Sequence, residues 1–241
     1  MIDGKGIDHS TWIWESNTAT YCENIGCSQL NQYNYADATN ANYSYSRFIR
    51  ESSFCAIATH GNKYGIQSSM RNIYNGHNNC NSSCGICYDM YDTAILNALP
   101  DNYFANTRCV VSTACETAKG GETDSTNFVN VLHSKGVETV VGFEKKTWFS
   151  YNTSTLQTIT TKGSFKWPIE FTRLLGEGYT VDYSVARAYE ITIDANLEAN
   201  GKYTEYDLEN GLIPEEIETQ EILCGLDSYC VVGNGGQIIM H

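Results

Sequence analysis

The feature that most constrains the fold is a set of three short apolar runs separated by segments of helical periodicity. The runs lie in SSFCAIATHGN (52–62), RCVVSTAC (108–115) and VETVVGF (137–143). Nearly continuous apolar runs of this length are typical of parallel strands that are covered on both faces. The order strand, helix, strand, helix, strand predicts right-handed crossovers, and therefore an α/β fold with a mostly parallel sheet between layers of helices.

The segments between and after these strands carry the helical signals. We expect four helices, in YDMYDTAILNALPD (88–101), DSTNFVNVLHSKG (124–136), WPIEFTRLLGEG (167–178) and TVDYSVARAYEITID (180–194). The first brings Tyr91 into an apolar stripe and stops at Pro100. The second takes Asp124 or Ser125 as its N-cap and ends at Gly136.

The remaining segments are expected to join the same core. Residues 1–47 are polar and become helical towards Tyr45, and residues 62–87 form a loop rich in Gly, Asn and Cys. SYCVVGNGGQIIM (228–240) is expected to form a strand and a turn. No internal repeat or linker interrupts the sequence, so we predict a single domain over residues 1–241.

The charge of the chain argues against some classes of partner. With 28 acidic against 15 basic residues, the formal net charge is -13, and the Lys and Arg residues are not clustered. Nucleic acids and anionic membranes favour concentrated positive charge, so we expect neither as a partner. No apolar run approaches the ~18 residues that cross a bilayer. We therefore expect a neutral or basic substrate.

The composition also bears on location. Ten cysteines are many for a reducing cytosol, and the chain is rich in Asn, Thr and Tyr. The segment MIDGKGIDHS (1–10) has neither the basic nor the apolar region of an export signal. We nevertheless expect an extracellular or cell-surface protein on the strength of the composition.

A cysteine-rich loop leaves several readings open. His77, Cys80, Cys84 and Cys87 have the spacing H-x2-C-x3-C-x2-C, which suits structural Zn²⁺, and the three cysteines alone have a spacing that holds iron–sulfur clusters. The loop lacks the context of a cluster-binding barrel, so we predict no metal and no cofactor. If the protein is exported, disulfides are the more favoured alternative, among Cys22, Cys27, Cys80, Cys84, Cys87, Cys224 and Cys230, and free thiols are the other.

Reactive side chains follow the predicted strands at the edge where parallel sheets bind ligands. His60, Cys115 and Glu144 each come just after an apolar run. A thiol fixed at a strand end beside an imidazole can lose its proton and attack a carbonyl carbon. A single cysteine in a strand is more often a small buried hydrophobic residue, as we expect for Cys55 and Cys109. The other histidines, His133 among them, are expected to face solvent.

The two strand ends resemble a known family. AIATHGN (56–62) and VVSTACETAKGG (110–121) are similar to the two motif blocks of the caspase-like cysteine peptidases, which include caspases, clostripain, gingipains, separase and CHAT domains. The stretch Ala-Cys-Glu-Thr most resembles CHAT domains, and the likeness extends over about residues 50–192. Residues 1–47 match loosely. The resemblance implies a three-layer α/β sandwich of the caspase–haemoglobinase type and, by likeness to secreted members, a bacterial source.

The resemblance also implies roles for individual residues. Cys115 would be the nucleophile, His60 the general base and then acid, and the backbone N–H groups of Gly61 and Cys115 the oxyanion hole. Glycine at position 61 would let the main chain approach the oxyanion, and one such donor is worth about 3 kcal/mol of barrier. The implied activity is that of a cysteine endopeptidase acting through a Cys-His dyad and a thioester. The alternative is a catalytically silent binding or signalling module on the same fold.

Substrate preference is expected to come from acidic residues near the nucleophile. In the family, the loop after the strand that follows the catalytic one lines the primary pocket, and here it is VVGFEKKTWFSYN (140–152). Glu144 in this loop would pair with an Arg or Lys before the scissile bond of a peptide or protein substrate. Glu116, Asp124 and Glu122 are further candidates. A solvated Glu144 paired with a neighbouring lysine is the other reading.

Overall fold

The computed structural model of the protein describes residues 2–3, 33–34, 41–72, 86–147, 166–200 and 225–239. Packing divides the chain into two compact units, which are described separately. The sheet unit comprises Met1–Ile7, Asn31–Lys145 and Tyr229–Gly235. The helical unit comprises Asp8–Leu30, Lys146–Ser228 and Gly236–His241. A division by packing does not test whether residues 1–241 form one domain, which stays a prediction.

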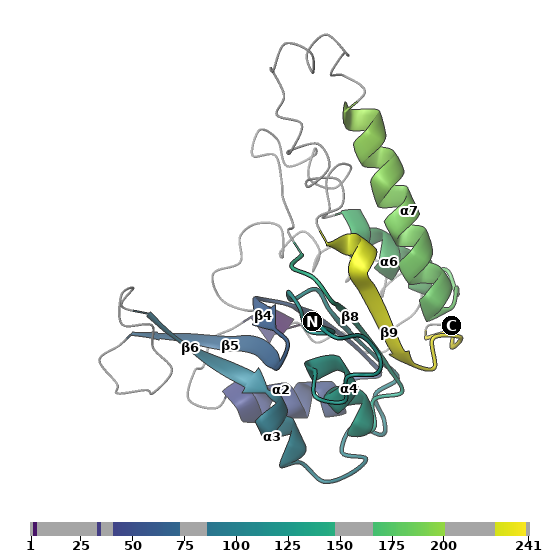
Figure 1. The fold of residues 1–241 in the computed structure, drawn as a ribbon. Helices are drawn as coiled ribbons and strands as arrows, with labels where there is room; N and C mark the ends of the chain where they lie inside the picture. Colours follow the sequence, from purple (N-terminus) through teal and green to yellow (C-terminus); the bar gives the residue numbers. More distant parts are fainter. Residues whose placement is uncertain are drawn as a thin grey trace. The chain divides into compact units, whose positions relative to one another are not determined.

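The sheet unit is built on a six-stranded, mostly parallel sheet (Figure 1). Its strand order is β2-β1-β3-β7-β8-β9. The strands are β1 (Ile2–Asp3), β2 (Tyr33–Asn34), β3 (Phe54–Ala58), β7 (Cys109–Ser112), β8 (Thr139–Phe143) and β9 (Tyr229–Gly233). All neighbours are parallel except β9, which runs antiparallel to β8. This confirms the predicted α/β class with a mostly parallel sheet, and it is consistent with a three-layer sandwich.

The central strands have the continuous burial that their sequences predict. Every residue of β7 and β8 is buried, and in β3 the run Cys55–Ile57 is buried. The register aligns Cys55 with Val110, and Val110 with Val140. Because these strands are parallel and adjacent, their carboxyl ends meet at one edge of the sheet.

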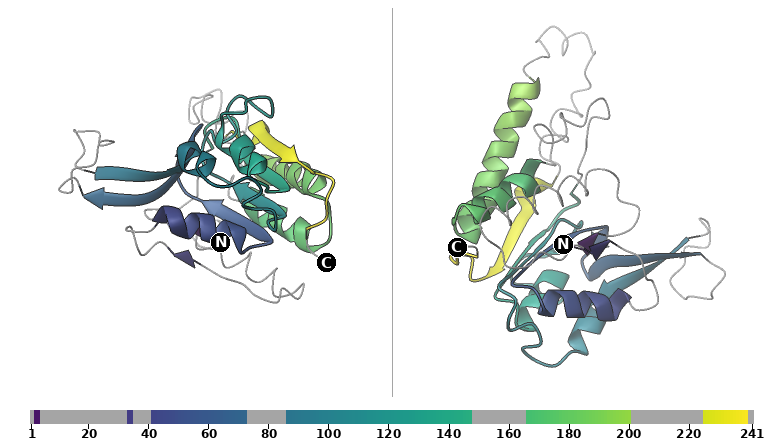
Figure 2. Two further views of the ribbon diagram at one scale, coloured as in Figure 1. Left: turned by 90° about the horizontal axis from the view of Figure 1, so that it is seen from below. Right: turned by 180° about the vertical axis from the view of Figure 1, so that it is seen from behind.

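Three helices of the sheet unit lie together on one side of the sheet (Figures 1 and 2). They are α2 (Ala41–Arg50), α3 (Thr93–Asn97) and α4 (Phe128–Ser134). An aromatic cluster joins α2 and α4 to β6. Tyr91 stacks on Tyr45 with ring centroids 5.4 Å apart, and it meets Phe128 edge-on at 6.2 Å. The Tyr91 hydroxyl is 2.8 Å from the hydroxyl of Ser46, so the polar end of this buried ring is satisfied.

The prediction of a loop over residues 62–87 is wrong for most of the residues described there, which are 62–72 and 86–87. The chain forms a second, antiparallel sheet from β4 (Gly61–Asn62), β5 (Gly65–Asn72) and β6 (Ile86–Asp92). Figure 1 shows β5 and β6 as a long ribbon beside the main sheet. Tyr91 therefore belongs to a strand, and the helix predicted from residue 88 begins only at Thr93, with Asp92 as its N-cap.

The helix over 124–136 also starts later than predicted. Its N-cap is Asn127, whose side chain accepts a hydrogen bond from the Asn130 N–H at 2.9 Å. Asp124 and Ser125 are not the cap, because the Asp124 carboxylate is engaged with Lys63. The predicted end is confirmed, since Gly136 has φ +107° directly after the C-cap.

The helical unit contains two helices that confirm the sequence prediction. They are α6 (Lys166–Gly176) and α7 (Val181–Asn200). Trp167 stacks on Phe171 at 5.1 Å, and its indole N–H donates to the carbonyl oxygen of Val185 at 3.3 Å, which ties the two helices together. A 3₁₀ turn at Leu226–Ser228 precedes β9. Among the described residues, no helix has the length and apolar character needed to cross a membrane.

Candidate active site

Two chain segments meet at the carboxyl edge of the main sheet. His60 and Gly61 follow β3, and Cys115 follows β7. The Thr113 N–H donates to the carbonyl oxygen of Ile57 at 3.0 Å, so the two segments stay hydrogen-bonded just beyond the end of β7. The prediction that the His-Gly and Ala-Cys motifs follow adjacent parallel strands is thus confirmed by the strand pairing.

Gly61 packs directly against the residues that flank Cys115. A methyl group on Gly61 would lie 2.7 Å from the Cβ of Ala114 and 3.2 Å from the Cγ2 of Thr117. Real Cβ atoms essentially never approach as closely as the first of these distances, so only glycine fits here without a shift. The backbone of Gly61, next to His60, therefore lies against the side chains of Ala114 and Thr117 in the turn that carries Cys115.

Cys115 differs from the other cysteines whose side chains are described. None of the four is part of a disulfide. Cys115 is partly exposed, whereas the other three are buried. Burial raises the pKa of the Cys55 thiol to about 11 and that of Cys230 to about 12, and it also raises the pKa of Cys109. These three thiols are protonated at neutral pH. Cys55 and Cys109 have the buried positions that the sequence predicted, and Cys230 does not form the predicted disulfide.

The turn after Cys115 is anchored to the end of β8. Glu116 adopts φ +57°, which is rare for a residue with a side chain, and its N–H donates to the Lys145 carbonyl oxygen at 3.0 Å. The Ala118 N–H donates to the carbonyl oxygen of Phe143 at 3.0 Å. The fully buried Thr117 donates its hydroxyl hydrogen to the carbonyl oxygen of Ala114 at 3.2 Å. This turn is therefore held from both ends.

The glycine-rich loop that follows is fixed by side-chain amides. Asn127 and Asn130 each donate a side-chain N–H to the carbonyl oxygen of Gly121 at 2.9 Å. The ammonium of Lys63 lies 2.6 Å from the carboxylate of Asp124. That contact, together with hydrogen bonds from Thr126, lowers the pKa of Asp124 from 3.8 to about 2. Sequence reasoning missed Lys63 and both asparagines, because nothing in their local sequence marks these long-range partners.

The acidic residues predicted to bind substrate have different surroundings. Glu116 pairs with Lys119 at 2.7 Å, and Asp124 pairs with Lys63. Glu144 is exposed, and both of its carboxylate oxygens lie 3.7 Å from the place where a Cβ on Gly121 would be. The loop that carries Glu144 therefore lies beside the loop that follows Cys115.

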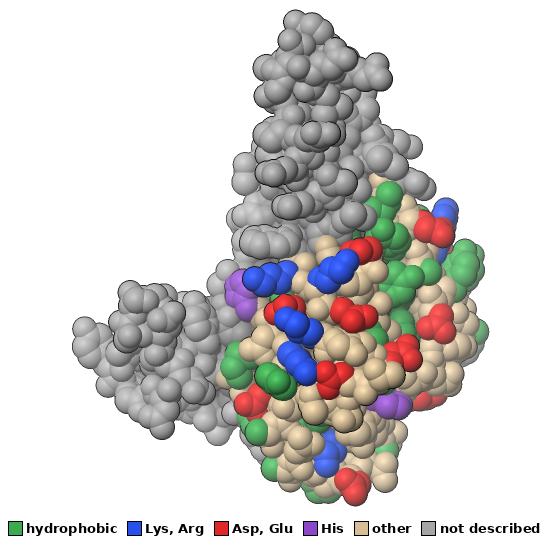
Figure 3. Space-filling view, viewed as in Figure 1, with side chains coloured by type: hydrophobic (Ala, Val, Ile, Leu, Met, Phe, Trp, Pro, Cys, Tyr) green, Lys and Arg blue, Asp and Glu red, His purple; other side chains and the backbone are tan. Residues whose placement is uncertain are grey.

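Charges of both signs surround these loops. On the face of the described residues shown in Figure 3, Lys and Arg side chains alternate with Asp and Glu side chains. In the loops after β4 and Cys115, Lys63 pairs with Asp124 and Lys119 pairs with Glu116. Two of the candidate acids thus carry a compensating cation, which reduces their attraction for a charged ligand.

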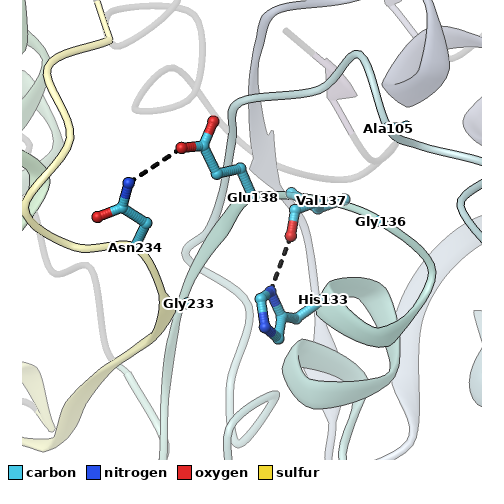
Figure 4. A pocket seen from close by; sticks show the side chains of 7 residues that line it. All are labelled: Ala105, His133, Gly136, Val137, Glu138, Gly233 and Asn234. Carbon is cyan, nitrogen blue, oxygen red and sulfur yellow. Dashed lines mark hydrogen bonds between the residues drawn. The ribbon is translucent and has the colours of Figure 1, made fainter.

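A hollow lies at the opposite edge of the sheet, where β8 begins (Figure 4). It is lined by Ala105, His133, Gly136, Val137, Glu138, Gly233 and Asn234. His133 is half-buried rather than solvated as predicted, and its Nδ1 lies 2.8 Å from the carbonyl oxygen of Val137. Because a carbonyl only accepts, Nδ1 carries the hydrogen. The Asn234 side-chain N–H donates to the carboxylate of Glu138 at 3.0 Å. These polar groups satisfy one another.

Most of the predicted metal and disulfide positions lie outside the described residues. His77, Cys80 and Cys84 lie there, together with Cys22, Cys27, Cys224, His9 and His241. Cys87 lies in β6, where its side chain is not described. Within the described part of the chain, no group of three or more His, Cys, Asp or Glu residues could hold a metal ion. The readings of the cysteine-rich loop stay predictions.

Comparison with known proteins supports the fold. No protein-family profile and no curated protein matches the sequence. A solved structure described as that of a protease is similar to this chain, with a TM-score of 0.53 and 18% sequence identity. The match covers 98% of this chain and 48% of that one, so the chain spans about half the length of its structural relative. Identity this low shows the fold alone.

Proposed function

We propose that the chain is a cysteine endopeptidase in which Cys115 attacks the scissile carbonyl and His60 transfers the protons. The observation that carries this proposal is the contact of Gly61 with Ala114 and Thr117, which brings the two strand-end motifs together. The similarity of the fold to a protease structure supports the same class of activity. The partial exposure of Cys115, in contrast to the buried thiols, adds a third line of support.

In the proposed reaction, His60 accepts the thiol proton and the sulfur of Cys115 bonds to the carbonyl carbon of the substrate. The oxyanion that forms accepts hydrogen bonds from the backbone N–H groups of Gly61 and Cys115. His60 then donates the proton to the departing amine, which leaves a thioester on Cys115. A water molecule, deprotonated by His60, hydrolyses the thioester and restores the thiol. The reaction needs no metal or cofactor.

We further propose that the enzyme prefers Arg or Lys before the scissile bond and that Glu144 provides the recognition. Glu116 and Asp124 are already paired with lysines, which leaves Glu144 as the better candidate of the three. Burial is the main cause of the raised pKa of Cys230, and the charges of Glu122 and Glu144 add to it, so the two carboxylates lie near the same thiol. A guanidinium or ammonium group of the substrate would compensate this charge.

A thiol-directed peptidyl probe tests the nucleophile. The probe is a peptidyl acyloxymethyl ketone, and cleavage of labelled casein is measured in parallel. We expect wild-type protein and Cys230→Ala, the matched control at a buried thiol, to be labelled and to cleave casein. We expect Cys115→Ala to do neither. Labelling that persists in Cys115→Ala would exclude Cys115. Folded wild-type protein that neither reacts nor cleaves would favour the silent binding module.

A fluorogenic peptide library tests the specificity. The residue before the scissile bond is varied, and kcat/KM is compared for wild type, Glu144→Gln and the distant control Glu138→Gln. We expect a preference for Arg and Lys that falls about tenfold in Glu144→Gln and is unchanged in Glu138→Gln. A preference for Asp or for an apolar residue would contradict an acidic pocket. An unchanged preference in Glu144→Gln would exclude Glu144 from recognising the basic residue and would assign that role to another acid.

A further inference from the structure

We propose that Thr117 is a positioning residue, whose hydroxyl fixes the direction of the Cys115 backbone N–H towards the oxyanion of the reaction. The inference rests on the proposed peptidase function and adds a residue to it. Thr117 belongs to the motif Ala-Cys-Glu-Thr, but the sequence analysis gave it no role. Its assignment comes from three sets of contacts around its side chain and backbone.

The first contact is the hydrogen bond between the Thr117 hydroxyl and the carbonyl oxygen of Ala114, at 3.2 Å. The carbonyl of Ala114 and the N–H of Cys115 belong to the same peptide group. The described residues contain no cis peptide bond, and a planar trans peptide points its C=O and N–H in opposite directions. Holding the carbonyl of Ala114 on the Thr117 side therefore turns the N–H of Cys115 to the other side.

The second set of contacts fixes Thr117 between the two strand-end segments. Thr117 is 0% exposed. Its Cγ2 lies 3.2 Å from the place where a Cβ on Gly61 would be, and its Oγ1 lies 2.8 Å from the corresponding place on Gly142 in β8. The absence of side chains at these two glycines is what admits the threonine. Thr117 therefore contacts the His60–Gly61 segment and β8 at the same time.

The third contact holds the backbone of Thr117. Its carbonyl oxygen accepts a hydrogen bond from the N–H of Val129 in α4 at 3.2 Å. Glu116, between Cys115 and Thr117, has φ +57°, a conformation that is rare for a residue with a side chain. Surrounding contacts must maintain such a conformation, and those of Thr117 are close enough to do so. The turn around Cys115 is thus strained locally and held by its buried neighbour.

Two matched pairs of variants isolate the hydroxyl. Thr117→Val replaces the hydroxyl with a methyl group of similar size, and Thr117→Ser keeps the hydroxyl without Cγ2. Thr117→Ala differs from Thr117→Ser by the oxygen alone, so it covers the case in which the valine variant does not fold. The bond is longer than the usual O–H···O distance, so we expect an effect smaller than the 10²–10³-fold loss caused by removing an oxyanion donor.

The readouts separate positioning from a structural role. We measure kcat and KM on the fluorogenic peptide that wild type cleaves fastest, the rate at which iodoacetamide alkylates Cys115, and thermal stability. Alkylation forms no oxyanion, so its rate should not depend on the N–H direction. We expect kcat to fall about tenfold or more in Thr117→Val and Thr117→Ala, with little change in KM or alkylation rate, and to stay near the wild-type value in Thr117→Ser.

Each contrary outcome has a distinct meaning. Equal kcat in wild type, Thr117→Val and Thr117→Ala would overturn the inference and leave the proposed peptidase intact. A loss of kcat that Thr117→Ser shares, together with a lower unfolding temperature and a changed alkylation rate, would show a structural role and would also overturn it. Wild-type protein that is alkylated at Cys115 but cleaves no peptide in the library would overturn the proposed function, and the inference with it.

Discussion

The two ends of the central strands in the sheet unit contain similar residue types in different arrangements. Each end holds a histidine, glutamates and a glycine in very close contact with its neighbours. At the amino end of β8, His133 is bonded to a backbone carbonyl and Glu138 to Asn234 (Figure 4). At the carboxyl end, the partly exposed thiol of Cys115 follows β7, and the exposed side chain of His60 follows the neighbouring strand β3. The first arrangement ties β8 to β9, and the second leaves reactive groups accessible.

Residue type alone does not identify a site. At each end, a glycine leaves room for a neighbouring segment to pack closely. Gly61 leaves room for the turn that carries Cys115, and Gly233 leaves room for the carbonyl oxygen of Glu138. The two ends differ in the group that packs against the glycine: a turn that carries a reactive thiol at one end and a backbone carbonyl at the other. Parallel strands gather their following loops at the carboxyl edge, so side chains from separate parts of the sequence converge there. The following predictions test this difference.

The largest contrast is expected between the two histidines. We predict that His60→Ala lowers kcat/KM about 10²–10⁴-fold, because the thiol and the leaving amine lose their proton carrier. We predict that His133→Ala keeps wild-type kcat/KM, because its ring bonds only to the Val137 carbonyl in the described structure. Kinetics on one fluorogenic peptide measures both. Comparable losses in the two variants would remove the distinction between the ends.

A second contrast concerns the thiols. At pH 8 a thiol with a pKa of about 12, as in Cys230, is ionised in about one molecule in ten thousand, and the thiolate is the form that reacts. We predict that iodoacetamide modifies Cys115 at least about 100-fold faster than Cys55, Cys109 or Cys230 in the native protein. Peptide mapping by mass spectrometry at timed intervals measures the four rates. Modification of Cys230 as fast as that of Cys115 would contradict the assignment.

A third contrast compares the two close-contact glycines. Gly61→Ala would bring its methyl group 2.7 Å from the Cβ of Ala114, and we predict a loss of about 1–3 kcal/mol in the free energy of unfolding and at least a tenfold loss of kcat. Gly233→Ala combines φ +98° with a contact of 2.1 Å to the Glu138 carbonyl oxygen. We predict a similar loss of stability of about 1–3 kcal/mol, with kcat per folded molecule unchanged.

Chemical denaturation and active-site titration separate these two effects. Denaturation gives the free energy of unfolding, and titration of Cys115 with the peptidyl probe gives the amount of folded enzyme. Gly61→Ala that loses stability but keeps full kcat would show that the close approach serves folding alone.

The smallest effect is expected from the ion pair that fixes the glycine-rich loop. The pKa of Asp124 is lowered from 3.8 to about 2, chiefly by Lys63, so the ionised form is favoured in the folded protein. Its contribution to stability is therefore complete above pH ~4 and lost as the pH falls towards 2. We predict that Asp124→Asn unfolds at a slightly lower temperature than wild type at pH 6, and that the difference disappears near pH 2.

Thermal unfolding between pH 2 and 7 measures this dependence. Asp101→Asn is the control, because the Asp101 side chain is 92% exposed and its contact with the Lys135 ammonium is longer, at 3.4 Å, so its unfolding temperature should stay closer to wild type than that of Asp124→Asn. A constant difference between wild type and Asp124→Asn across the whole range would show that the carboxylate charge is not responsible.

The main sheet could be predicted from the sequence because its strands have both faces covered. The run from Val110 to Ser112 is apolar or small throughout, which is the pattern of a doubly covered parallel strand, and the structure buries it completely. The positions of His60 and Cys115 followed from the ends of these strands. The local sequence was therefore enough to predict the carboxyl edge of the sheet and the motifs that lie on it.

The ribbon of β5 and β6 could not be predicted in the same way. Tyr91 stands at helical spacing from Ala94 and Ile95, which indicated a helix, but its ring is buried against Tyr45 and Phe128. Those contacts join residues far apart in the sequence and override the local preference. Asp124 was taken for an N-cap for a similar reason, since its partner Lys63 lies in another loop.

The pairing of β8 with β9 has a consequence for the order in which the protein is made. Val141 pairs with Val231, and many residues separate the two strands. During synthesis, β8 is complete long before its neighbour leaves the ribosome, and contacts of this range are slow to form. Until then, the strand has an edge ready to pair with another chain. We therefore expect this edge to stay unpaired in nascent chains between the synthesis of Phe143 and that of Tyr229, and slower growth of the chain would lengthen the interval.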